Sequence, residues 1–253
     1  MTTLSDPVEE TRRIIEAASA DGLPIRAVGG VGVAMIAPTV ARLEPRRTYH
    51  DIDLAAPPGT AAITRLMTAL GYEAAAAFNT LNGSERLLFH DQDGRRVDIF
   101  IDTLRMCHEL PFRDRLGFDA WRWTLPPADL LLSKLQIVEL TERDAQDVLA
   151  LLADHGLSEA GGNGIELGRI GEVCGNDWGW WRTVDDNLAR LIAGWIEPAG
   201  ASERAPVGTR STATERARAL RTTLLTCPKS MAWRVRAIVG PRMRWYELPE
   251  EVR

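Results

Sequence analysis

Cysteine is scarce in this chain, and so are long apolar runs. Three cysteines occur among 253 residues, Cys107, Cys174 and Cys227, and they are widely separated and odd in number. This pattern argues against a disulfide framework and against a zinc site built from cysteines. No apolar run approaches the roughly 18 residues that span a bilayer, so we expect no contact with a membrane. The acidic N-terminal residues lack the basic and then apolar layout of a signal peptide, which favours the cytoplasm.

The composition is that of an ordinary globular protein, with one asymmetry in charge. Hydrophobic residues make up 45% of the chain and charged residues 26%, which is too apolar for intrinsic disorder. The formal net charge is −5, yet residues 201–253 are basic and the remainder is correspondingly acidic. A basic segment can attract a polyanion such as RNA, although a solvated helix face explains the same composition at least as often.

Periodicity predicts a mixed sheet flanked by helices, followed by a mostly helical C-terminal domain. The expected helices over residues 7–20, 31–36 and 60–70 alternate with strands over 25–28, 51–54, 72–78, 86–90 and 96–101. Further helices are expected over 128–140, 142–153, 165–174, 177–196, 212–225 and 228–239. The glycine-rich segment 161–164 is the best interior boundary. We therefore predict an α+β fold with domains at 1–160 and 161–253.

Two carboxylates that lie two residues apart indicate a metal site. Alternate side chains of a strand share one face, so Asp51 and Asp53 project together. Their like charges repel each other unless a cation lies between them, and carboxylate oxygens suit Mg²⁺ or Mn²⁺. Asp98, in the alternating strand at 96–101, completes a two-metal site if that strand neighbours the first. Asp102 is the alternative third carboxylate.

Polar backbone and guanidinium groups near these carboxylates indicate a phosphate site. Gly29 and Gly30 offer backbone N–H groups at the start of a helix, where the phosphates of a nucleotide bind favourably. Arg46 and Arg47 precede the carboxylate strand, and guanidinium groups bind phosphate well. The alternative for both arginines is a role as plain surface charge. Together with the carboxylates, these groups suit phosphoryl transfer.

Several of these residues follow one another in an order that is known from one superfamily. In chain order they are Gly29-Gly30, Arg47-x-x-x-Asp51-x-Asp53, the strand Val97-Asp98-Ile99, and helical Lys134 with the later Arg143-Asp144 and Asp147. This order resembles the polymerase-β-type nucleotidyltransferase superfamily over roughly residues 24–154. Within it, the chain is similar to small bacterial nucleotidyltransferases of the abortive-infection and type IV toxin kind.

The resemblance implies a nucleotidyltransferase-like catalytic domain at 1–160 and a role for each motif. Gly29 and Gly30 would bind the triphosphate, Asp51 and Asp53 would bind metal, and Asp98 would help to activate the attacking hydroxyl. Lys134 would contact the nucleotide phosphates or the acceptor; a solvated or partly buried helix lysine is the alternative. The implied reaction moves a nucleoside monophosphate from a nucleoside triphosphate such as ATP to an acceptor hydroxyl, and it releases pyrophosphate.

Three questions stay open at the level of the sequence. The acceptor can be an RNA 3′ end, a protein side chain or a small molecule such as an aminoglycoside. Gly30 stands where many active members of the superfamily have Ser, which favours a catalytically idle nucleotide-binding protein as the rival. A toxin with an antitoxin partner is a third interpretation. The C-terminal tryptophans are expected to pack in the core rather than to stack on bases.

Overall fold

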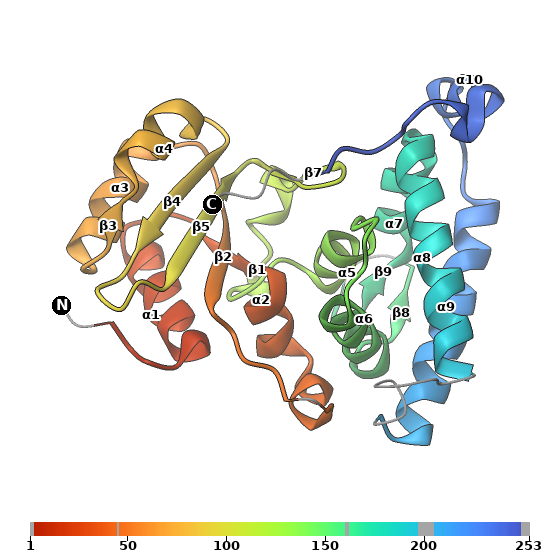
Figure 1. Ribbon diagram of the computed structural model, residues 1–253, viewed down its shortest axis with the longest axis horizontal. Helices are drawn as coiled ribbons and strands as arrows, with labels where there is room; N and C mark the ends of the chain where they lie inside the picture. Colours follow the sequence, from red (N-terminus) through yellow and green to blue (C-terminus); the bar gives the residue numbers. More distant parts are fainter. Residues whose placement is uncertain (1–2, 45, 160–161, 197–204, 249–253) are drawn as a thin grey trace. The chain divides into compact units, whose positions relative to one another are not determined.

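A computed structural model describes residues 3–44, 46–159, 162–196 and 205–248 (Figure 1). It divides into two compact units. Unit 1 comprises Met1–Ile36, Thr48–Leu104 and Pro111–Pro126, and unit 2 comprises Ala37–Arg47, Arg105–Leu110 and Pro127–Arg253. The domain boundary expected between residues 160 and 161 falls outside the described residues. Within the described part of the chain, no helix is long and apolar enough to cross a membrane.

Unit 1 is built on a mixed five-stranded sheet with the strand order β1-β2-β5-β4-β3. Its strands are β1 (Arg26–Val28), β2 (Asp51–Ala56), β3 (Glu73–Ala74), β4 (Arg86–His90) and β5 (Arg96–Ile101). The central pair, β2 and β5, is parallel, whereas β1 pairs with β2, β4 with β5 and β3 with β4 in the antiparallel sense. The helices of this unit are α1 (Pro7–Ala20), α2 (Gly29–Ile36), α3 (Thr60–Ala69) and α4 (Ala76–Asn82).

The two faces of this sheet differ in chemistry because side chains alternate along each strand. One face carries Ile52 and Leu54 of β2 and Val97 and Ile99 of β5, all fully buried in the main hydrophobic core with residues of α1 and α3. The intervening residues, which include Asp51, Asp53 and Asp98, belong to the opposite face. The core therefore fixes the register that brings the carboxylates onto one surface of the sheet.

Unit 2 is mainly helical. Its long elements are α5 (Pro127–Leu135), α6 (Glu142–Asp154), α7 (Leu167–Asn176), α8 (Trp178–Ile196), α9 (Val207–Thr226) and α10 (Met231–Val239). Short strands β8 (Leu157–Ser158) and β9 (Ile165–Glu166) pair in parallel. The chain also contains β6 (Thr103–Arg105), β7 (Glu109–Pro111) and the 3-10 helices Pro38–Arg42, Arg113–Arg115, Asp119–Trp121 and Gly240–Arg242.

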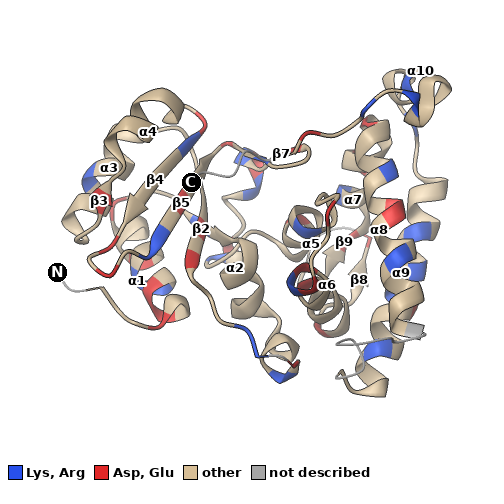
Figure 2. Ribbon diagram, viewed as in Figure 1, with Lys and Arg blue, Asp and Glu red and all other residues tan. Residues whose placement is uncertain are grey.

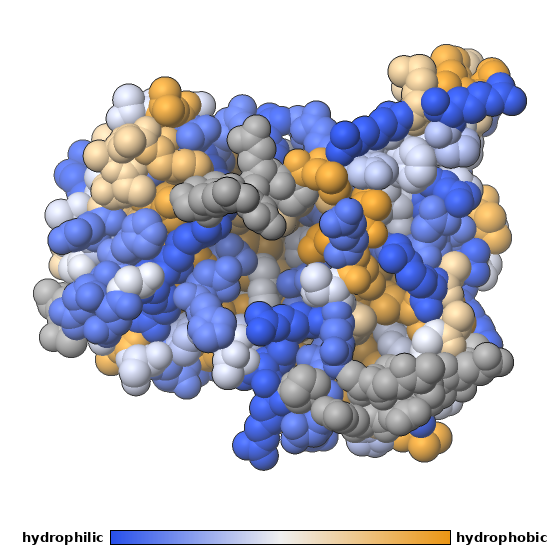
Figure 3. Space-filling model, viewed as in Figure 1, coloured by the Kyte–Doolittle hydropathy of each residue, from blue (hydrophilic) through white to orange (hydrophobic). Residues whose placement is uncertain are grey.

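Tryptophans form much of the packing between the helices of unit 2. Trp178, Trp180 and Trp195 are buried, and Trp181 meets Trp233 edge to face with ring centroids 5.4 Å apart. An edge-to-face arrangement is a preferred geometry for packed aromatic rings. Apolar side chains remain on the exposed side of α10, where Figure 3 has an orange patch. The buried tryptophans thus pack in the core as expected.

Most expected helices form, and one of the differences has a local cause. The strand expected over 72–78 is limited to Glu73–Ala74, and α4 takes the rest. Alanine has the highest helix propensity, so the alanine-rich residues 74–77 favour the helix over a strand. Helix α2 begins at Gly29 rather than at residue 31, and α5 ends at Leu135 rather than at residue 140.

Candidate functional site

The expected metal ligands of unit 1 lie on two adjacent strands. In the parallel register of β2 and β5, Asp53 is opposite Asp98 and Asp51 is opposite Arg96. Figure 2 colours the acidic residues of the sheet red and the basic residues blue. Residues that are opposite each other in a sheet point to the same face, so the three carboxylates share a face. They differ in burial: Asp51 is exposed, Asp53 is half-buried, and Asp98 is 1% exposed. Solvent therefore reaches Asp51 and Asp53 more readily than it reaches Asp98.

The glycine turn packs directly against one of these carboxylates. Gly29 has a φ of +65° and begins α2, and the preceding Val28 is opposite Asp53 in the β1–β2 register. A Cβ atom at Gly29 would overlap Oδ2 of Asp53. Glycine is thus required here for two reasons, since the positive φ and the close approach both exclude a side chain. The first turn of α2, with the half-buried Gly30, therefore lies beside the carboxylate of Asp53. The helix dipole favours a negative charge at this end of a helix.

Two arginines that the sequence analysis did not single out enclose Asp98. Arg86 of β4 donates to Oδ1 from Nε at 2.8 Å and approaches it with Nη2 at 2.7 Å, and Arg96 donates from Nε to Oδ2 at 2.6 Å. Burial acts to lower the pKa of Arg96, but the hydrogen bond to Asp98 and the charges of Asp98, Asp51 and Asp53 outweigh it, so that this pKa is raised. The three carboxylates and two guanidinium groups form one electrostatic cluster.

The chemistry of this cluster fits a divalent cation at one end only. Asp51 and Asp53 present hard oxygen ligands on the accessible part of the face, as Mg²⁺ requires. Both oxygens of Asp98 instead accept guanidinium groups. Among the residues that the structure describes, no group of three or more His, Cys, Asp or Glu side chains is arranged to hold a metal ion. A role of all three carboxylates as ligands stays a prediction.

Asp102, the alternative third carboxylate, lies beyond the end of β5. Its backbone adopts a left-handed conformation with φ 59°, so the strand alternation that would place it beside Asp98 stops before it. Its carboxylate accepts a hydrogen bond from Nε of Arg113 at 2.8 Å. Asp102 is therefore engaged with the following segment of unit 1.

The cations that we expected to bind phosphate, Lys134, Arg46 and Arg47, belong to unit 2. Nζ of Lys134 lies 2.9 Å from Asp147 and 3.1 Å from Asp144, and Arg47 donates to Asp147 at 2.8 Å. Burial is the largest influence on Lys134 and acts to lower its pKa, but the two carboxylates together outweigh it and raise that pKa. In contrast, the side chain of Arg46 is 84% exposed. Lys134 and Arg47 thus join α5, α6 and the segment before β2 in a buried ionic network.

Two of the four arginines of α9 are engaged within unit 2. Arg216 donates from Nη1 to the backbone carbonyls of Leu152 and Ala153 at the end of α6. Arg221 donates from Nε to Asp185 of α8 at 2.6 Å, whereas Arg218 is exposed. Two of these three arginines therefore stabilise helix packing, which accounts for part of the basic composition without a polyanion.

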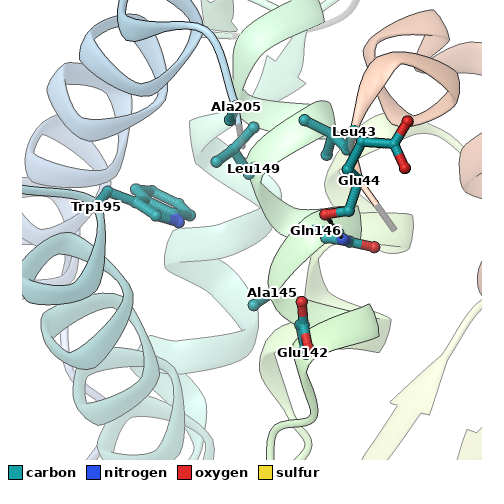
Figure 4. Close-up of a pocket in the computed structure, with 8 residues that line it drawn as sticks. All are labelled: Leu43, Glu44, Glu142, Ala145, Gln146, Leu149, Trp195 and Ala205. Carbon is teal, nitrogen blue, oxygen red and sulfur yellow. Dashed lines mark hydrogen bonds between the residues drawn. The ribbon is translucent and has the colours of Figure 1, made fainter. Parts of the chain in front are cut away.

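A small apolar hollow is also present in unit 2, between the segment that precedes Arg46 and helices α6 and α8 (Figure 4). Leu43, Leu149, Trp195 and Ala205 supply its apolar lining, and Glu44, Glu142 and Gln146 are the polar residues around it. It contains no member of the carboxylate cluster of unit 1 and none of Lys134, Arg46 and Arg47. The hollow is therefore distinct from the site that the motifs indicated.

Comparison with known proteins adds no family assignment. No family model matches the chain, and no curated protein sequence matches it. The carboxylate cluster and the glycine turn are therefore the features of this chain that indicate a function.

Proposed function

We propose that this protein is a metal-dependent nucleotidyltransferase that moves a nucleoside monophosphate from a nucleoside triphosphate to an acceptor hydroxyl. The observation that supports this most strongly is the position of Asp53. It lies on one sheet face with Asp51 and Asp98, and it touches the glycine at the start of α2. A pair of carboxylates beside a helix N-terminus combines cation binding with phosphate binding, which are the two requirements of phosphoryl transfer.

Each residue has a distinct part in this proposal. Asp51 and Asp53 would hold Mg²⁺ or Mn²⁺, which when bound supplies Lewis-acid stabilisation of charge on the phosphates. Backbone N–H groups at Gly29 and Gly30 would orient the triphosphate. Asp98, across from Asp53, would be the third ligand of the divalent cation, and it would also accept the proton of the acceptor hydroxyl as that hydroxyl attacks the α-phosphate and pyrophosphate leaves. The acceptor would be an RNA 3′ end, a protein side chain or a small molecule.

A catalytically idle nucleotide-binding protein is the second candidate, and one observation favours it. Asp98, the residue that would take the proton, already accepts hydrogen bonds from Arg86 and Arg96. An acceptor hydroxyl would have to displace these guanidinium groups to reach the carboxylate. Release of pyrophosphate separates the candidates, because only the enzyme releases it in a metal-dependent manner from one of the nucleoside triphosphates. A toxin with an antitoxin partner would in addition inhibit growth on expression, and a neighbouring gene product would relieve the inhibition.

The deciding variant is Asp53→Asn, with Asp93→Asn as the matched control. Asp93 is exposed in the turn between β4 and β5, so its amide variant removes the same charge away from the cluster. In wild type, Mn²⁺ plus a non-hydrolysable nucleoside triphosphate at about 100 times the Kd should stabilise the protein by about 2.7 kcal/mol. Asp53→Asn should lose this stabilisation, and Asp93→Asn should retain it. An equal ligand-induced shift in melting temperature for both variants would remove Asp53 from the site.

A further inference from the structure

The feature that the proposed function leaves unexplained is the pair of arginines on Asp98. Three carboxylates and two guanidinium groups give the cluster one net negative charge. Asp98 is almost fully buried, whereas the side chains of Arg86 and Arg96 are 23% and 33% exposed. Solvent therefore reaches the two arginine side chains more readily than it reaches Asp98. An anion that approaches this face meets the arginines before it meets the carboxylate.

Arg86 has a second set of contacts that does not depend on Asp98. Its guanidinium carbon lies 5.1 Å from the ring centroid of Phe100 and 5.8 Å from that of Phe78. Cation–π contacts of this kind hold an arginine in place without a hydrogen bond. The guanidinium group can thus exchange its acceptor and still remain over the same face of the sheet.

We infer that Arg86 and Arg96 bind the polyphosphate of the nucleotide and that this exchange releases Asp98 for the divalent cation. The inference rests on the proposed function and deepens it, because it makes nucleotide binding the event that completes the metal site. Guanidinium groups match the oxygens of phosphate as well as those of a carboxylate, so the exchange replaces one set of charge-assisted hydrogen bonds with another. A cation alone provides no such replacement.

Positive coupling between anion and cation follows from this exchange. A cation that binds without a polyphosphate must compete with two guanidinium groups for Asp98. A polyphosphate that binds without a cation must compete with Asp98 for the same two groups. The polyphosphate and the cation therefore each increase the affinity of the protein for the other by the same factor. For typical coupled sites this factor is roughly 5- to 150-fold.

Single substitutions should change the two affinities in opposite directions. Arg96→Gln should tighten the binding of Mn²⁺ alone by roughly tenfold and weaken the binding of inorganic tripolyphosphate, measured without metal, by a similar factor. Asp98→Asn should tighten tripolyphosphate roughly tenfold, because it releases both guanidinium groups. Arg65→Gln is the control for a lost positive charge, since Arg65 is exposed on α3. Isothermal titration calorimetry measures each affinity.

The opposite signs distinguish exchange from a structural role. If the arginines only stabilise the sheet, Arg96→Gln weakens both ligands or changes neither, and that result overturns the inference. Arg96→Gln keeps Arg86 on Asp98, which protects the fold, and circular dichroism checks it. Arg96→Lys provides a second variant: it keeps the charge but loses the planar fork, so it should weaken tripolyphosphate while changing Mn²⁺ affinity less than Arg96→Gln does.

Failure of the inference and failure of the proposed function produce different results. If Mn²⁺ with a non-hydrolysable nucleotide stabilises wild type but not Asp53→Asn, the proposed function stands, and the arginine variants then decide the inference alone. If Asp53→Asn behaves as wild type does, the proposed function fails. The metal-free tripolyphosphate measurement still decides whether these arginines form an anion site. If Arg96→Gln and Asp98→Asn both leave the affinity for tripolyphosphate unchanged, the inference is overturned.

Discussion

His108 should make the stability of unit 2 depend on pH. Its ring is half-buried, its Nε2 lies 2.9 Å from Oγ1 of Thr183, and it packs on Trp180 with ring centroids 5.0 Å apart. Burial lowers the pKa of His108 from 6.5 to about 4, and the charge of Asp177 offsets this only in part. Because the pKa is lower in the folded state than in the unfolded state, the unfolded state binds more protons between these values. The stability contributed by the neutral ring is present above pH 6.5 and is lost as the pH falls toward 4.

The size of the effect follows from the two pKa values. A difference between 6.5 and about 4 corresponds to about 3 kcal/mol when it is fully expressed below pH 4. Between pH 7.5 and pH 5.0 the loss in the free energy of unfolding should be about 2 kcal/mol. His108→Gln removes the titrating ring and keeps a group that can hydrogen-bond to Thr183. Its free energy of unfolding should therefore fall by about 2 kcal/mol less than that of wild type over this range.

Urea denaturation followed by tryptophan fluorescence at pH 7.5 and pH 5.0 provides the measurement. Carboxylates that titrate in the same range contribute to wild type and variant alike, so the difference between the two isolates His108. His50→Gln is the control, because His50 is exposed and precedes β2. The reasoning would be refuted by a parallel loss of stability in wild type and His108→Gln.

Two further substitutions test the packing around the motifs. Gly29→Ala should destabilise unit 1 by about 1–3 kcal/mol more than Gly22→Ala. Both positions have positive φ, at a cost of about 1–2 kcal/mol, but only at Gly29 would the new Cβ meet another side chain, that of Asp53. Equal urea midpoints would contradict the close approach. Lys134→Met should lower the free energy of unfolding by about 3–5 kcal/mol, because it leaves the buried Asp147 with one cation fewer. Arg143 is exposed on α6, the helix of Asp147, and Arg143→Met should change the free energy of unfolding by about 0.5 kcal/mol or less.

The sequence predicted the parts of the site that depend on local periodicity. Strand alternation alone places Asp51 beside Asp53, and the fully buried Ile52 between them explains why the pair faces away from the core. The glycine turn was also visible, because few other residues adopt the conformation of Gly29. Strand alternation cannot predict that Asp98 lies next to Asp53. This proximity depends on β5 pairing with β2 although β3 and β4 intervene in the chain, which periodicity cannot reveal.

The partners of the charged residues could not be predicted from the sequence. Arg86 reaches Asp98 because the antiparallel register of β4 and β5 pairs Leu88 with Asp98, and that register depends on the hairpin and the core. The motif around Lys134 indicated contact with a phosphate. In the folded chain, the turn between α5 and α6 brings Asp144 and Asp147 within hydrogen-bonding distance of Lys134. The contact of Lys134 with a phosphate stays a prediction. Tertiary contacts therefore decide which charges remain available to a ligand.

The fold of unit 1 and the proposed ligand site both depend on the contact between Gly29 and Asp53. A variant that tests ligand binding without disturbing the fold must therefore change another position. The positive φ of this glycine starts α2 and brings its backbone against Asp53. A side chain at position 29 would disturb the helix start, the carboxylate and the phosphate site together, so a loss of ligand binding there would not identify the cause. Asp53→Asn preserves the volume of the side chain and removes one of two repelling charges on β2. If the apo variant keeps the circular dichroism of the folded wild type, a loss of ligand binding in it reports on the ligand itself.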